Sequence, residues 1–167
     1  MGLPRRGVVL ICLVMAAGCA PDPAVLVVDL KTDYLAGVEI DGARLEVTSS
    51  SGELRTLPDV TIAEGATLLT GLRIGEISVP PGDHRLVLTL QRGNAPVATR
   101  AVSVTVTVDR AVTVLATRSC EDVRCEAPDS ECVGGVCVSE RCTPETPESC
   151  PAPACVADAD CVPALSC

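Results

Sequence analysis

The sequence predicts a mainly β protein, in which an antiparallel β-sandwich (residues 24–118) is followed by a small, disulfide-rich and irregular module (residues 119–167). Within residues 102–109, valine occupies every second position and serine, threonine or aspartate stands between, which is the period of a strand with one buried face. Turn-forming residues separate this run from other apolar runs at short intervals. Nine of the 11 cysteines fall in the second segment.

The first segment of the chain, residues 1–18, has the layout of a secretory signal peptide. Arg5 and Arg6 give it a basic start, residues 7–15 are apolar, and small residues follow. The uncharged run over residues 7–18 is shorter than the roughly 20 residues that a membrane-spanning helix needs. The segment is therefore predicted to be a cleaved leader and not a membrane span.

The end of this leader, Ala16-Ala17-Gly18-Cys19, resembles the lipobox of bacterial lipoproteins, with Ala16 where that family usually has leucine. The resemblance implies a lipid on Cys19, cleavage before it and acylation, for example by palmitate, of the new amine. Several acyl chains would anchor the protein firmly in a membrane. Because Ala20 stands where inner-membrane lipoproteins often carry aspartate, the outer membrane is the expected location. The alternative is ordinary secretory cleavage nearby, which would release a soluble protein.

A short tether, residues 19–23, precedes the predicted sandwich. About seven strands in about 95 residues fit two packed antiparallel sheets, and the best helical alternative, residues 61–72, is interrupted by Gly65 and Gly71. The core would be aliphatic, since the chain has no Phe or Trp and one Tyr. The expected strands cover residues 25–30, 38–47, 54–62, 68–77, 86–91, 102–109 and 112–117.

The later part of this domain resembles the immunoglobulin-like and carboxypeptidase-regulatory-like sandwiches of bacterial surface lipoproteins. In residues 80–83, a Pro-Pro-Gly-Asp turn feeds an alternating strand, and a hairpin centred on Gly93 leads into a strand rich in threonine and valine. Such domains are mostly spacers or adhesion modules. The fold alone fixes no function.

The second segment is predicted to be held together by disulfides, because it is rich in cysteine, poor in apolar residues and expected to be exported. It carries ten carboxylates against Arg124 and Arg141. Eight cysteines already allow 105 pairings, and nine leave one unmatched, free or intermolecular, or indicate that the chain stops inside a longer protein. The candidate disulfide cysteines are Cys120, Cys125, Cys132, Cys137, Cys142, Cys150, Cys155, Cys161 and Cys167.

Residues 132–137, Cys-Val-Gly-Gly-Val-Cys, resemble part of the small EGF-like or Dickkopf-type cysteine-rich modules. Zinc is the rival interpretation of such a cluster, but there is no Cys-x-x-Cys pair and the only histidine, His84, lies in the other domain. Asp158 and Asp160 could bind calcium, although two carboxylates without a longer ligand series are more typical of a solvated acidic loop. No metal is therefore predicted.

The sequence predicts a non-catalytic protein without a cofactor. The net charge of −9 argues against a nucleic-acid partner, and no phosphate-binding or dinucleotide motif occurs. His84 is the one imidazole that could activate a nucleophile, and its place beside a Pro-Gly turn favours a solvated or capping role. We expect a cell-envelope lipoprotein that presents the sandwich and the module for surface binding or adhesion. The alternatives are a structural spacer of a longer surface protein and a lipoprotein that binds a small ligand or calcium.

Overall fold

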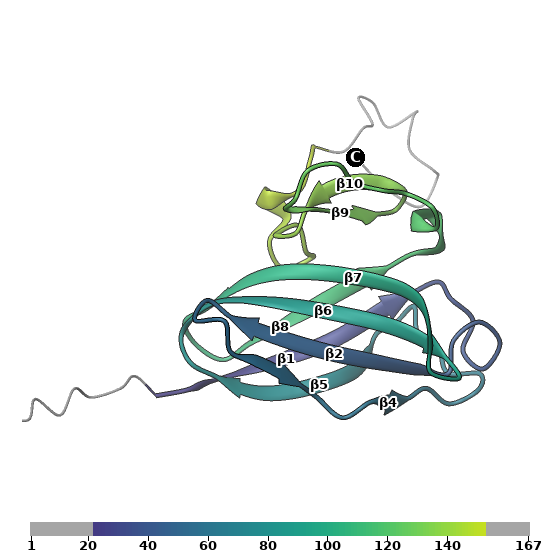
Figure 1. Ribbon diagram of the computed structural model, residues 1–167, viewed down its shortest axis with the longest axis horizontal. Helices are drawn as coiled ribbons and strands as arrows, with labels where there is room; N and C mark the ends of the chain where they lie inside the picture. Colours follow the sequence, from purple (N-terminus) through teal and green to yellow (C-terminus); the bar gives the residue numbers. More distant parts are fainter. Residues whose placement is uncertain (1–21, 153–167) are drawn as a thin grey trace, which may run out of the picture.

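The computed structural model describes residues 22–152, and it confirms a mainly β chain with a disulfide-rich C-terminal region (Figure 1). Two sheets pack face to face, and a small module lies over one side of them. The leader, Cys19 and Cys155, Cys161 and Cys167 lie outside the described residues. Within the described part, no helix is long and apolar enough to cross a membrane.

The first sheet has three strands in the order β5-β1-β8. They are β1 (Ala24–Thr32), β5 (Leu72–Val79) and β8 (Arg110–Ala116). Strand β1 is antiparallel to β5 but parallel to β8. A short turn joins β7 to β8, but the two strands lie in different sheets. β8 crosses to the first sheet and pairs there with β1, which runs in the same direction.

The second sheet is antiparallel, with the order β3-β2-β6-β7 and with β4 also paired to β2. Its strands are β2 (Gly42–Ser49), β3 (Leu54–Thr56), β4 (Val60–Thr61), β6 (Gly82–Arg92) and β7 (Ala95–Val106). The hairpin between β6 and β7 turns at Gly93 and Asn94, with φ of 53° and 68°. Positive φ at both central residues gives the two-residue turn that matches the strand twist.

The core lies between the two sheets and is aliphatic, as predicted. Val102, Val104 and Val106 are buried on the inner face of β7, and the leucines of β6 alternate in the same way. Each large side chain buried here contributes about 1.5–3 kcal/mol to stability. Gly75 is required in this layer, because a Cβ there would lie 2.7 Å from the side chain of Leu57.

Four expected strands are wrong in their limits. The strand over residues 102–109 is the end of β7, which stops at Val106, so Val108 is not on the buried face but is 69% exposed. The strand over residues 54–62 is broken into β3 and β4, because Pro58 has no N–H to donate to a sheet. The strand over residues 68–77 begins only at Leu72, after Gly71, which has a φ of 103°. Residues 38–41 belong to a folded loop before β2. In this loop the carbonyl of Leu35 accepts the N–H groups of Val38, Glu39 and Ile40.

The C-terminal module has little regular structure and almost no apolar core. It consists of the 3₁₀ turns η1 (Arg118–Cys120) and η2 (Pro147–Ser149) and the hairpin β9 (Ser130–Val133) and β10 (Val136–Ser139). Val138 is its one buried hydrophobic side chain among the described residues. Its shape must therefore depend on disulfides and polar contacts.

Candidate functional site

Three disulfides hold the module, which confirms the predicted scaffold for six of the nine cysteines. They join Cys120 to Cys132, Cys125 to Cys137 and Cys142 to Cys150. Cys132 and Cys137 face each other in the register of β9 and β10, so the first two bridges fasten both strands of the hairpin to the segment that precedes it. Each disulfide typically contributes about 2–4 kcal/mol.

The module covers one side of the sandwich, where β7 ends one sheet and β8 ends the other (Figure 1). The outward-facing N–H of Ser103 in β7 donates to the carbonyl of Glu140, at 3.0 Å. The N–H of Thr113 in β8 donates to both carboxylate oxygens of Glu145, at 3.1 Å each. Edge strands otherwise present unpaired backbone groups to solvent. The module thus supplies acceptors to both edges.

Glu140 is the best-bonded carboxylate in this contact. Its side chain is only 5% exposed, and it accepts hydrogen bonds from Arg85 at 2.7 Å and from the hydroxyl of Ser103 at 2.9 Å. Burial raises the pKa of Glu140, but the hydrogen bonds from Arg85 and Ser103 outweigh burial and hold this pKa below its usual value. Glu140 therefore stays ionised and ties the module to β6 and β7.

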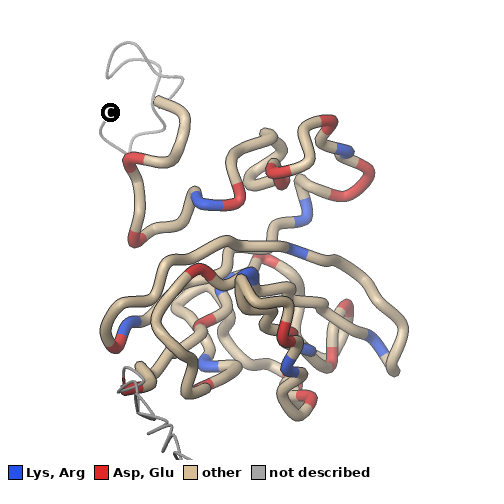
Figure 2. Tube along the Cα trace, turned by 60° about the vertical axis from the view of Figure 1, so that its left-hand side comes forward, with Lys and Arg blue, Asp and Glu red and all other residues tan. Residues whose placement is uncertain are grey.

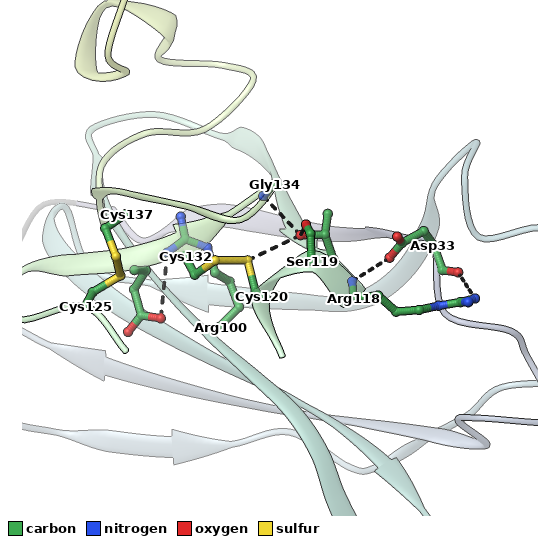
Figure 3. Close-up of a disulfide and its surroundings, with 11 residues drawn as sticks. Asp33, Arg100, Arg118, Ser119, Cys120, Cys125, Cys132, Gly134 and Cys137 are labelled. Carbon is green, nitrogen blue, oxygen red and sulfur yellow. Dashed lines mark hydrogen bonds and ion pairs between the residues drawn. A yellow bond between two sulfur atoms is a disulfide. The ribbon is translucent and has the colours of Figure 1, made fainter. Parts of the chain in front are cut away.

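Arg100 is a second, less well-paired charge at the same contact. It projects from β7 beside the Cys120–Cys132 disulfide (Figure 3) and is 3% exposed. Its Nη1 lies 3.9 Å from Oε2 of Glu131, and neither Nε nor Nη1 has a hydrogen-bond partner among residues 22–152. Burial lowers the pKa of Arg100 and raises that of Glu131. A buried ion pair with unmade hydrogen bonds repays little of its desolvation.

The joint between the sandwich and the module is fixed from both sides (Figure 3). The hydroxyl of Thr117 accepts the N–H of Gly134 from the module, at 3.0 Å. The N–H of Arg118 donates to the carboxylate of Asp33 from the sandwich, at 2.9 Å. A cavity of about 290 Å³ lies beside this joint, lined by Tyr34, Arg100, Thr117 and the first disulfide among others.

A different feature lies at the end of the sandwich where β1 finishes. There the side chains of Leu35, Val38 and Leu69 are 54%, 63% and 70% exposed, and a groove of about 330 Å³ runs between the loops that carry them. The loop that carries Leu35 and Val38 is braced, because Arg92 donates to the carbonyls of Gly37 and Val38. These two side chains are therefore held out in solvent by a fixed backbone.

Of the two roles expected for His84, solvated or capping, the structure excludes the solvated one. His84 is 4% exposed and its Nε2 donates to the carbonyl of Pro80 at 2.8 Å, so it braces the turn between β5 and β6. Within residues 22–152, no group of three or more His, Cys, Asp or Glu side chains is placed to hold a metal ion. Asp158 and Asp160, the candidate calcium ligands, lie outside the described residues.

Sequence reasoning missed the contact made by Arg100, Glu131 and Glu140. Arg100 stands at an inward position of β7, two residues before the buried Val102. This position was the one sign in the sequence that Arg100 would be buried and would need a partner. No protein-family model, curated protein or solved structure matches the chain.

Proposed function

We propose that this chain is a non-catalytic lipoprotein of the cell envelope that presents its sandwich and cysteine-rich module to a partner at the surface. The lipobox-like residues 16–19 supply the anchor. β1 starts at Ala24, directly after the tether, and its nine residues extend about 30 Å. The start of β1 and the β1–β2 loop lie at opposite ends of the sandwich (Figure 1).

One observation carries the binding role. The exposed Leu35, Val38 and Leu69 gather at the end of the sandwich opposite the start of β1, and Arg92 fixes the backbone of the loop that carries the first two. Their exposure adds nothing to folding, and clustered exposed apolar side chains mark interaction sites. A lipid at one end and an apolar groove at the other suit a protein that displays a binding face away from its membrane.

The anchor is tested by the intact mass of the protein from the membrane fraction. We expect residues 19–167 plus three acyl chains, and we expect Cys19→Ser to abolish acylation. Cys12→Ser is the matched control, because it removes the leader's other cysteine and should leave acylation unchanged. A wild-type mass without acyl chains would refute the lipid anchor.

The binding face is tested on the purified, unlipidated chain, by its attachment to intact cells in flow cytometry. Leu35→Ser with Val38→Ser should lower attachment at least tenfold. Val108→Ser should not, although Val108 is 69% exposed, because it lies in the turn after β7 at the anchored end. Equal attachment by all variants, or none by the wild type, would leave the spacer interpretation in place.

A further inference from the structure

Strand β7 has the composition of an edge that pairs with other chains unless it is covered. It is 12 residues long, rich in valine, threonine and alanine, and Arg100 is its one charged residue. Natural edge strands are usually protected by several charges, by irregularity or by a covering segment. Only the last protection applies over the central part of β7, where the backbone of Ser103 bonds to the module.

The cover is held by polar contacts that favour reversible docking. Within its described residues the module buries one apolar side chain, Val138, whereas permanent interfaces are typically apolar. Its contact with β7 encloses Arg100 and Glu131 at 3.9 Å, without a hydrogen bond at Nε or Nη1 of the arginine. Separation would rehydrate both charges and recover a desolvation cost that the contact does not offset.

The charge of the protein is also concentrated on the cover. Residues 24–118 carry 11 acidic and nine basic side chains, whereas the described part of the module, residues 119–152, carries eight acidic and two basic ones. Acidic positions outnumber basic ones along the module, and the two signs alternate over the sandwich (Figure 2). Like charge keeps copies apart, so a sandwich without its docked module loses most of the repulsion at this edge.

We propose that the cysteine-rich module is a releasable cover of β7, and that the uncovered edge pairs with β7 of a second copy of this chain. Two antiparallel β7 strands related by a two-fold axis present the same residues to each other. The N–H of Ser103, which the module now occupies, would donate to the partner strand instead. The two five-stranded sheets would join into one continuous sheet. This assembly does not depend on the lipid anchor.

The test compares two double variants of the purified chain with the same change in charge. Glu140→Ala with Glu145→Ala removes both carboxylates that hold the edges. Glu126→Ala with Glu148→Ala removes two exposed carboxylates of the module. By light scattering after size exclusion, we expect the first variant to have twice the mass of the wild type and the second to have the same mass. The species of twice the mass must dissociate in detergent when no reductant is present. If it did not, a disulfide between two chains would explain the doubled mass.

Two further measurements keep the outcome clear. Adding Thr99→Lys and Thr105→Lys to the first variant places charges on the edge and should restore the single mass. Exchange of the Ser103 amide reports release as long as the mass stays single, because its acceptor is the backbone carbonyl of residue 140, which the alanine variant keeps. Fast exchange with a single mass would overturn the pairing, and slow exchange with a single mass would overturn the release. Should the variant not fold, the wild-type chain in reductant gives the same two readouts after its disulfides open.

Discussion

Replacement of Glu140 by glutamine tests the docking of the module most directly. The substitution keeps the shape of the side chain and removes the charge that accepts hydrogen bonds from Arg85 and Ser103. A hydrogen bond to a charged group contributes about 1.5–3 kcal/mol. Because the side chain of Arg85 is 48% exposed, solvent screens this pair, and the lower end of the range, about 1.5 kcal/mol, is the expected loss.

The assay is native-state hydrogen exchange at the amide of Ser103, which donates to the carbonyl of Glu140. A loss of about 1.4 kcal/mol is tenfold in an equilibrium constant, so opening of the module and exchange of this amide should be roughly tenfold faster. The amide of Leu88, inside the sheet, should not change. Glu148→Gln, at an exposed position of the module, is the control. Acceleration of less than twofold at Ser103 would refute the reasoning that this carboxylate fastens the module.

Three further predictions concern the same contact. Replacing Arg100 by methionine together with Glu131 by leucine should leave the free energy of unfolding unchanged or raise it by up to roughly 4 kcal/mol. Glu131→Leu alone should lower the free energy of unfolding by about 3 kcal/mol, because it leaves the arginine buried without its counter-charge. Thermal unfolding measures both effects. Replacing both cysteines of the Cys142–Cys150 disulfide by serine should cost about 2 kcal/mol in thermal unfolding and accelerate exchange at the β8 edge, whose acceptor lies in that loop. Acid should loosen the module, because the folded pKa values of Glu140 and Glu145 lie below the usual 4.5. The stabilisation by these two carboxylates is complete above that pH and is lost as the pH falls through their folded pKa values. Glu131 has a raised pKa and acts in the opposite sense. A melting temperature that does not fall between pH 6 and pH 3 would contradict the last prediction.

The sequence predicts the sandwich well where period two is unbroken, as in residues 102–106, because alternation and burial have the same cause. It fails where one residue decides. Pro58 divides a strand that apolar content alone would continue, and the fixed loop before β2 takes Val38 out of the sheet and into solvent. Similarly, cysteine density predicts a disulfide scaffold but no pairing, because the pairing depends on which segments the β9–β10 hairpin brings together.

Arg100 shows why the contact between the two parts could not be predicted. By its position in β7 it belongs to the same face as Val102 and Val104, and a charge at such a position normally indicates that the strand has been assigned wrongly. The assignment is correct, because the sandwich is open at this end of β7 and the module closes it. A module with few apolar residues of its own closes such a gap mainly with backbone groups and carboxylates. The arginine, the glutamates and the scarcity of apolar residues in the module are therefore parts of one solution, in which polar docking covers an apolar strand.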